Sequence, residues 1–396
     1  MLKTIEFSLR LLIPLLFVTS IKAQERPEYF IGGTMTFAHH LMKECGATYK
    51  QEGIPTDPFL TMSAYGANTI RLSYYLPPYE NEFSQGYPQP DFTSISEVIA
   101  QIASARRFNL KVILTFGYKS WALNSKDKRN DYVAPLNWQA VATRIDMLRD
   151  SVYNHTKLAL DTLAKLNLMP DMVTLGNETN WHIMLANYHQ DSLPQYDPAR
   201  TIFLLAAGAK AVRDISSEYK IDTQIGIHLF NASRLSFWLD LHRAYELDYD
   251  FIGLSHYEGW HQLDRNYKNW GTFIEAVKEK YNKPILILET AQNFTLGQND
   301  LGTNILGRTN LVDSLQKDFS PSYQRQYLFS FAKEILDNGG LGLITWGTEW
   351  IGNDCVIYPN KWAPGSSWEE KTYWDFDGNV HEGINWMKDI QDWIKH

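Results

Sequence analysis

Short, nearly continuous apolar runs recur along the whole chain, separated by longer stretches in which apolar residues return every three or four positions. Such short runs are typical of strands that are buried on both faces. We identify eight of them: Tyr29–Met35, Asn68–Leu72, Lys111–Phe116, Met172–Gly176, Thr223–His228, Phe251–Ser255, Pro284–Glu289 and Leu341–Trp346.

Most of these runs are followed by a segment with helical spacing. Such segments are Ser94–Phe108, Ala199–Tyr219, Tyr267–Tyr281 and Ser322–Leu336. Eight strands that alternate with helices predict an α/β protein with a (β/α)8 TIM barrel, in a single domain. An open doubly wound sheet is the alternative, but the turn after the first run, Gly32–Met35, lacks the GxGxxG spacing of a phosphate-binding loop.

Residues 1–23 have the pattern of a secretory signal peptide. Basic residues come first, the apolar run Leu11–Val18 follows, and the small residue Ala23 ends the segment. A first core helix is the alternative, which Pro14 disfavours. We therefore expect a signal peptide, a barrel domain over residues 24–396, and export to the periplasm or the extracellular space.

The composition fits a globular protein. Of 396 residues, 44% are hydrophobic and 21% are charged, which argues against a disordered or integral membrane protein. The net charge of −8 is unfavourable for binding nucleic acid or an anionic membrane. The 13 tryptophans and 22 tyrosines fit either a large aromatic core or platforms for a ligand with flat apolar faces, such as a sugar.

In a TIM barrel the carboxyl ends of the strands carry the chemistry. Polar or aromatic residues end five of the runs: Arg71, Asn177-Glu178, His256-Tyr257, Glu289 and Trp346. Glu178 and Glu289 come from opposite sides of the barrel and can converge at its mouth. Two such carboxylates fit glycoside cleavage, with a separation of about 5–5.5 Å for retention and about 6.5–9.5 Å for inversion. The alternative is a pair of ordinary carboxylates at strand ends.

Several motifs resemble those of one enzyme family. They are ECGATYKQEG at Glu44–Gly53, YGANTIRL at Tyr65–Leu72, PDMVTLGNET at Pro170–Thr179, IGLSHYEGWH at Ile252–His261, KPILILETA at Lys283–Ala291, LITWGTEWI at Leu343–Ile351 and WDFDGN at Trp374–Asn379. Over about residues 30–385 the chain resembles glycoside hydrolase family 53, the arabinogalactan endo-β-1,4-galactanases, within the wider clan of retaining (β/α)8 glycosidases.

The resemblance implies retaining hydrolysis of β-1,4-galactan by two glutamates. Glu178 matches the general acid/base and Glu289 matches the nucleophile. Arg71 would keep the nucleophile ionised, and Tyr257, or His256 beside it, would orient it.

The resemblance also implies the contacts with the sugar. Asn177 would bond the 2-hydroxyl of the reacting sugar, and Trp346 would form the floor beneath that sugar. Trp121 and Trp260 would stack on flanking sugars, although either ring could instead belong to the core.

Three strand ends depart from the family pattern. The usual GADxS, DFH and WEPAW are replaced by Gly33–Thr36, Thr115–Gly117 and Trp346–Trp350. Losing hydrogen-bonding groups near the reacting sugar changes which hydroxyl pattern is accepted. Two alternatives therefore stay open: a retaining glycosidase on another β-linked polysaccharide, and a catalytically weak carbohydrate-binding protein on the same barrel.

No cofactor and no metal in the active site are expected. The histidine pairs His39-His40 and His256 with His261 lack a known ligand spacing, so sugar contact or capping is favoured. Asp375–Asn379 resembles the start of a calcium loop but lacks the downstream acidic ligand, which favours a hairpin turn. The resemblance leaves a structural calcium ion open. The expected partner is a polysaccharide or oligosaccharide, bound by a monomer without a membrane anchor.

Only two cysteines are present, Cys45 and Cys355. Cys45 follows the first predicted strand and Cys355 follows the eighth, and these strands become neighbours when a barrel closes. Because export permits oxidation, we predict a Cys45–Cys355 disulfide; two free thiols are the alternative.

Overall fold

The computed structural model describes residues 28–76, 94–120, 134–186, 195–258, 260–261, 263–305, 319–353, 355 and 365–396. The expected signal peptide, residues 1–23, and Trp121 lie outside these described residues.

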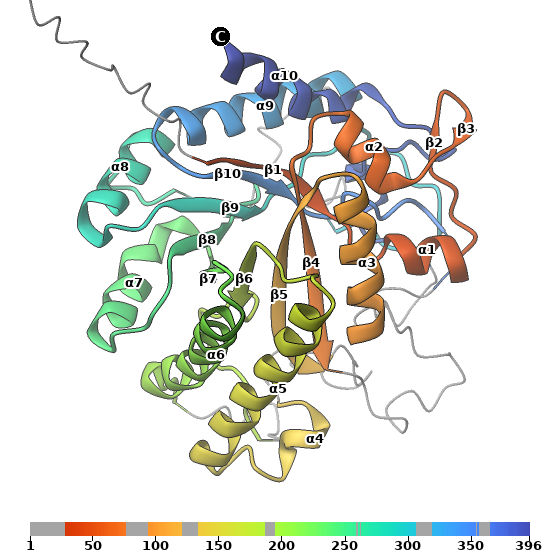
Figure 1. The fold of residues 1–396 in the computed structure, drawn as a ribbon. Coiled ribbons are helices and arrows are strands. Elements are labelled where there is room, and N and C mark those ends of the chain that lie inside the picture. Colours follow the sequence, from red (N-terminus) through yellow and green to blue (C-terminus); the bar gives the residue numbers. More distant parts are fainter. Residues whose placement is uncertain are drawn as a thin grey trace, which may run out of the picture.

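Eight parallel strands form a closed barrel (Figure 1). In chain order they are β1 (Phe30–Thr34), β4 (Thr69–Leu76), β5 (Lys111–Ser120), β6 (Met172–Leu175), β7 (Gln224–Phe230), β8 (Phe251–Ser255), β9 (Ile285–Glu289) and β10 (Gly342–Thr345). Gly33 of β1 pairs with Ile70 of β4 on one side and with Thr345 of β10 on the other, so the first and last strands complete the ring. This arrangement confirms the (β/α)8 prediction and excludes an open sheet.

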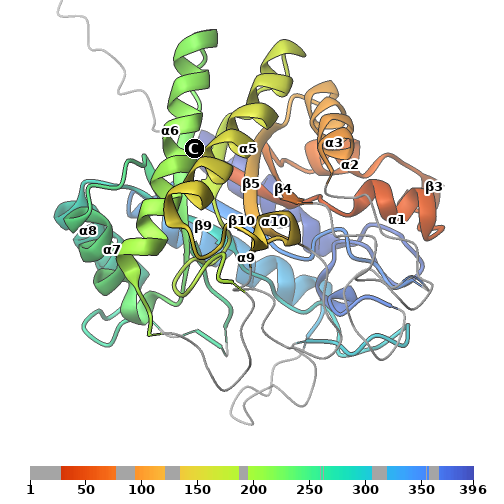
Figure 2. The ribbon, with the colours of Figure 1, turned by 90° about the horizontal axis from the view of Figure 1, so that it is seen from below.

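Helices surround the barrel. The main ones are α3 (Ile95–Arg107), α5 (Ile145–Lys165), α6 (Pro198–Tyr219), α7 (Leu235–Ala244), α8 (Trp270–Tyr281), α9 (Pro321–Asp337) and α10 (Trp386–Lys395). Figures 1 and 2 show α5 and α6 side by side. Hydrogen bonds from Tyr153 to Asp214 and from Tyr219 to Asp161, 2.7 and 2.6 Å long, join these two helices.

Shorter elements complete the fold: α1 (Ala38–Glu44), α2 (Pro58–Ala64), α4 (Leu136–Gln139), the β2–β3 hairpin (Lys50–Gln51 and Ile54–Pro55), and 3₁₀ turns at Ala232–Arg234, Glu369–Lys371 and Glu382–Asn385. Within the described residues, no helix has the length and apolar character needed to cross a membrane.

The four predicted helical segments begin where a polar side chain can cap them. Each capping oxygen accepts a backbone N–H from the first helical turn, which satisfies one otherwise unpaired donor. The caps are Ser94 for α3, Asp197 for α6, Asn269 for α8 and Ser320 for α9.

Alternation along the strands separates two cores. Odd positions such as Ile113 and Thr115 of β5 face the barrel interior, whereas Val112 and Leu114 join the larger core beneath the helices. An apolar layer fills the interior: Phe30, Ile113, Met172, Phe251, Leu286, Leu288 and Ile344. Two residues further along β5 the interior becomes polar at Thr115, so the closed apolar layer supports a polar layer at the carboxyl ends.

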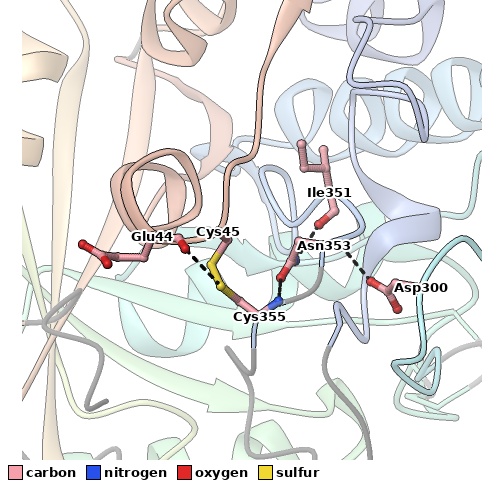
Figure 3. Close-up of a disulfide and its surroundings, with 6 residues drawn as sticks. All are labelled: Glu44, Cys45, Asp300, Ile351, Asn353 and Cys355. Carbon is pink, nitrogen blue, oxygen red and sulfur yellow. Dashed lines mark hydrogen bonds between the residues drawn. A yellow bond between two sulfur atoms is a disulfide. The ribbon is translucent and has the colours of Figure 1, made fainter. Parts of the chain in front are cut away.

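The two cysteines form a disulfide, as predicted (Figure 3). Their Cα atoms are 5.5 Å apart although 310 positions separate them in the sequence. Cys45 ends α1, after the first strand, and Asn353, after the last strand, accepts the backbone N–H of Cys355 at 2.8 Å. The bridge therefore ties together the loops of the two strands that close the barrel.

Asp375–Asn379 forms a turn, as predicted. Its flanking residues Trp374 and Val380 pair in antiparallel fashion. The carboxylate of Asp375 accepts the backbone N–H groups of Asp377 and Asn379 at 3.0 and 2.8 Å, so this oxygen serves the turn itself.

Candidate active site

Polar side chains from distant parts of the sequence gather around Arg71 at the carboxyl ends of the strands. Arg71, on β4, is fully buried. Its Nη1 donates to Oε1 of Glu289 at 2.7 Å, and its Nη2 donates to Oδ1 of Asn177 at 2.6 Å. The structure thus brings together three residues that the sequence singled out.

The remaining donors of Arg71 are also used. Nε donates to Oγ1 of Thr115 at 3.0 Å, and Nη2 lies 3.3 Å from Nδ1 of His228. A buried charge is costly unless it is both paired and hydrogen-bonded, and Arg71 meets both conditions. The guanidinium is therefore fixed in position, and it fixes the carboxylate of Glu289 as its counter-ion.

An irregularity in β9 aims Glu289 at this cluster. Leu254 of β8 pairs with Ile287, but the next residue, Ser255, pairs with Glu289, so Leu288 is the extra residue. Such bulges reorient side chains and often lie beside active sites. Leu288 can therefore face the apolar interior while its neighbour Glu289 reaches the polar layer.

Tyr257 holds the second oxygen of the same carboxylate. Its hydroxyl donates to Oε2 of Glu289 at 2.9 Å. Burial raises the pKa of Tyr257 well above its usual value, and the nearby charges of Glu289 and Glu178 raise it further. The phenol therefore stays protonated and remains a hydrogen-bond donor at neutral pH.

Glu178 lies opposite Glu289 and in a different environment. It follows β6, with a φ of 51°, after Gly176 with a φ of 75°. This left-handed turn at the strand end is uncommon for a residue other than glycine. A carboxylate oxygen of Glu178 lies within 4.8 Å of one from Glu289. Glu178 is half-buried, whereas Glu289 is buried against Arg71. The two carboxylates are therefore close but unequally surrounded.

His228 belongs to the same cluster, although the sequence reasoning did not single it out. It lies on β7, is fully buried, and has a ring nitrogen within 4.8 Å of both glutamates. The guanidinium of Arg71 can only donate, so Nδ1 of His228 must accept, and Nε2 then donates to Oγ of Ser255 at 2.9 Å. Burial and the charge of Arg71 lower the pKa of His228 well below 6.5, so the ring is neutral.

Carboxylate and imidazole groups are also metal ligands, so the cluster of Glu178, His228 and Glu289 has suitable donor types. However, both nitrogens of His228 already have partners, and the buried cation of Arg71 opposes a second positive charge. The contacts favour proton transfer and nucleophilic chemistry over metal binding. In a second group of donor types, Cys45 and Cys355 are bonded to each other beside His40.

Of the other predicted site residues, Trp346 and Trp260 lie near the cluster or its Tyr257, whereas the ring of His256 points elsewhere. Trp346 lies beside the cluster, with the guanidinium carbon of Arg71 5.8 Å from its ring centroid. Trp260 is 43% exposed and its ring meets that of Tyr257 at 5.7 Å. His256 is not brought to the carboxylates, because its ring packs against Trp270 and Phe331 from the surrounding helices. Of the two neighbours considered for orienting Glu289, Tyr257 bonds the carboxylate, whereas His256 bonds only the backbone carbonyl of Glu289, through its own backbone N–H at 2.8 Å.

At two of the strand ends that depart from the family pattern, other side chains of the protein contact the altered residues. At the end of β1, the hydroxyl of Thr34 donates to Glu349 at 3.2 Å, and both residues are buried. On β5, a Cβ at Gly117 would lie 2.1 Å from ring atoms of Tyr75, which is also buried. Buried side chains of this protein therefore occupy these positions.

Comparisons with known proteins relate the chain to one family of enzymes. The family model described as Glycosyl hydrolase family 53 matches residues 31–387. The chain is 28% identical to the arabinogalactan endo-β-1,4-galactanase of Cellvibrio japonicus over 355 residues, which cover 88% of this chain and 86% of that protein. It is 25% identical to the endo-β-1,4-galactanase of Bacillus subtilis over 91% of this chain and 80% of that protein.

Solved structures share the fold. The GH53 catalytic domain of Ignisphaera aggregans superposes with a TM-score of 0.75 at 24% identity, covering 91% of this chain and 96% of that domain. A structure from a study of two fungal β-1,4-galactanases gives a TM-score of 0.69 at 20% identity, covering 91% of this chain and 99% of the other. The barrel architecture is therefore common to these proteins.

Proposed function

Because this chain belongs to glycosyl hydrolase family 53, we propose that it is an exported endo-β-1,4-galactanase that cleaves with retention of configuration. Family membership makes it a galactanase-like glycoside hydrolase, for which a polysaccharide is the expected substrate. The proposal adds the sugar, the stereochemistry and the export. Two relatives, from Cellvibrio japonicus and Bacillus subtilis, are endo-β-1,4-galactanases by name, which supports β-1,4-galactan as the substrate. The signal-peptide pattern of residues 1–23 supports the export.

One observation carries the stereochemistry: carboxylate oxygens of Glu178 and Glu289 lie within 4.8 Å of each other. Retaining glycosidases have about 5–5.5 Å between these groups, whereas inverting enzymes need about 6.5–9.5 Å to admit a water molecule. The short separation favours direct attack by one carboxylate on the sugar.

The contacts then assign the roles. Glu289 is paired with Arg71 and accepts from Tyr257, so it is suited to attack the anomeric carbon as an ionised nucleophile. Glu178 is half-buried and lies across from Glu289, with carboxylate oxygens within 4.8 Å, so it is placed to exchange a proton with the leaving group. Glu178 would protonate the leaving oxygen and afterwards deprotonate the water that releases the sugar.

Neighbouring groups would bind the reacting sugar. Asn177 has its Oδ1 bonded to Arg71, which leaves its amide N–H₂ to donate to the sugar 2-hydroxyl. Trp346 would pack beneath the ring, held by Arg71 on one side and by Trp350 and Trp368 on the other.

A retaining glycosidase on another β-linked polysaccharide is the second candidate. It rests on Thr34 and Gly117, where this chain departs from the family pattern. The hydroxyl of Thr34 is bonded to Glu349, and Tyr75 fills the space beside Gly117. Neither position offers the side-chain donors of the usual motif, so the pattern of accepted hydroxyl groups would differ.

The test is product analysis with purified protein on a panel of β-linked polysaccharides, beside Glu178→Ala and Glu289→Ala. Galactooligosaccharides from β-1,4-galactan alone, lost in both variants, would support the proposal. Cleavage of another polymer would favour the second candidate, and binding without cleavage by the unaltered protein would indicate a carbohydrate-binding protein.

Azide adds a control for the two roles, using an activated aryl β-galactobioside. With Glu178→Ala it should trap the glycosyl-enzyme and give a β-glycosyl azide. With Glu289→Ala it should replace the nucleophile and give the α-azide. The opposite anomers would reverse the assignment of the two glutamates.

A further inference from the structure

An exposed tryptophan stands on the loop that carries Glu178. Trp181 follows Glu178 by three residues, and 41% of its surface is accessible. An indole is the largest apolar side chain, and one left exposed at a barrel mouth is a candidate contact for a ligand. Trp181 takes no part in bringing Glu178 and Glu289 together. The polar cluster around Arg71 therefore does not explain why the Trp181 ring is exposed.

Other aromatic rings hold Trp181 in place. Tyr196 and Trp238 meet it at centroid distances of 6.0 and 5.9 Å, with interplanar angles of 76° and 75°. Tyr196 and Trp238 also meet each other, at 5.3 Å and 79°. Trp238 is only 5% exposed. Three rings in mutual edge-to-face contact form a small packed group, of which Trp181 is the solvent-facing member.

The backbone of this loop is fixed as well. Asn180 exchanges two hydrogen bonds with the backbone of Phe230, at 3.1 and 2.8 Å, and the N–H of Thr179 donates to the carbonyl of His228 at 2.8 Å. These bonds attach the loop to the end of β7. A ring that is already oriented loses little conformational freedom when a ligand stacks on it.

The topology places this aromatic group at the catalytic face. Trp181 follows β6, Tyr196 precedes α6, and Trp238 lies in the first turn of α7. The loops from strand ends into α6 and α7 lie at the carboxyl face of the barrel, where Glu178 and Glu289 meet. The ring group is therefore on the rim of the mouth, next to β6 and β7.

The side of the mouth follows from the roles of the two glutamates. Glu178 adjoins the oxygen that leaves, so its loop borders the departing sugar. The opposite wall, with Glu289, Tyr257 and Trp346, encloses the sugar that becomes attached to the enzyme. A ring on the Glu178 loop can therefore meet the leaving part of the chain.

We propose that Trp181 forms a binding site for a β-galactopyranosyl unit on the leaving-group side of the cleaved bond. In the galactose unit beyond the cleaved bond, the axial C4 oxygen is the leaving oxygen and lies on one face of the ring. The C–H groups gather on the opposite face, and this apolar face would stack on the indole. The inference rests on the proposed function and deepens it, because it names the residue that grips the polymer beyond the reacting sugar. Binding energy gained there can be used to position the bond for cleavage.

The test compares two substrates that share the sugars on the nucleophile side. One is β-1,4-galactan, and the other is β-1,4-galactobiosyl fluoride, whose leaving group is a single atom and cannot reach Trp181. Trp181→Ala should lower kcat/KM for galactan about tenfold, since losing one apolar contact costs of that order, and should leave fluoride hydrolysis within about twofold. Trp181→Phe should recover part of the galactan activity because it restores a stacking surface.

A matched control is Phe203→Ala, which removes a 39% exposed aromatic ring on α6 outside the Trp181 group. It should change neither substrate. Equal losses on both substrates in Trp181→Ala would mean that the ring only supports the fold, and no loss on either would mean that it binds nothing; either result overturns the inference. Failure of the unaltered protein to hydrolyse both substrates would instead overturn the proposed function, and this inference with it.

Discussion

At the scale of single residues, one buried cation organises the site. Arg71 donates to the side chains of Thr115 on β5, Asn177 after β6 and Glu289 on β9, and it contacts His228 on β7. Leaving a buried charge without its partners costs several kcal/mol of free energy, roughly 3–5. The contacts of Arg71 with these side chains therefore hold them in place. The position of the carboxylate of Glu289, the proposed nucleophile, thus depends on the whole polar layer.

Glu349 is a second buried carboxyl group, and it has no buried cation among its described partners. It accepts from the backbone N–H of Phe37 at 3.0 Å and from Thr34 at 3.2 Å. Burial raises the pKa of Glu349 to about 8, although both hydrogen bonds act in the opposite direction. The side chain is therefore neutral in the folded protein below that pH.

This raised pKa predicts how stability depends on pH. Between about pH 4.5 and 8 the folded state binds a proton that the unfolded state has released, so the free energy of unfolding falls as pH rises. The slope from this group is about 1.4 kcal/mol per pH unit at most. Glu349→Gln should remove that slope and gain stability relative to the unaltered protein from pH 5 to 8, measured by urea unfolding.

Glu218→Gln, at an exposed position of α6, is the matched control and should leave the slope unchanged. Parallel stability curves for Glu349→Gln and the unaltered protein would show that Glu349 is already ionised in the folded state.

Site residues could be predicted from the sequence where the carboxyl end of a strand could be located. Arg71, Glu178 and Glu289 each close an apolar run, and that position marks the mouth of a barrel. His228 also ends a predicted run, so the same rule could have found it. His256 and Tyr257 are adjacent, and which of them faces the site depends on the local backbone after β8, which periodicity does not specify.

At the scale of elements, irregular strand pairing shapes the mouth. The register between β4 and β5 shifts between Tyr74 and Leu76, and the ring of the intervening Tyr75 covers Gly117. Both strands run four residues beyond their predicted ends at Leu72 and Phe116. The prediction stopped early because Ser73, Lys119 and other polar residues interrupt the apolar pattern there.

The contact between Tyr75 and Gly117 predicts that substitutions at these two positions have non-additive effects on stability. A Cβ at Gly117 would lie 2.1 Å from the Tyr75 ring, so Gly117→Ala should lower the free energy of unfolding by about 1–3 kcal/mol through overpacking. Tyr75→Ala removes the ring, so adding Gly117→Ala in that background should cost much less. Urea unfolding of the four proteins gives the coupling energy. Additive effects would contradict the proposed steric contact.

At the scale of the whole molecule, closure joins the two ends of the barrel sequence. β1 pairs with β10, and the Cys45–Cys355 disulfide links the loops that follow them. Between these loops lies an aromatic cluster that includes Phe37, Trp346 and Trp350, with both cysteines packed at its edge. The bridge was predictable because the barrel topology alone makes the first and last strands neighbours. The cluster was not, since it depends on how long loops fold.

The disulfide should therefore stabilise the closed barrel more than it affects catalysis. It spans 310 positions, and a bridge across a long loop typically contributes about 2–4 kcal/mol by restricting the unfolded chain. Arg71 and Glu289 lie on strands and bond each other, and Glu178 lies beside them just after β6, so their geometry does not require the disulfide. A dithiol reductant should lower the Tm of the unaltered protein, while kcat/KM on the proposed substrate, β-1,4-galactan, stays within about threefold at 25 °C.

The double variant Cys45→Ser, Cys355→Ser separates the bridge from other effects of the reductant. It should have the lower Tm from the start and show no further change when the dithiol is added. An equal fall in Tm in both proteins would point to the reductant itself. A large loss of kcat/KM at a temperature where the double variant is still folded would show that the loops joined by the bridge, with Trp346 between them, help to position the sugar.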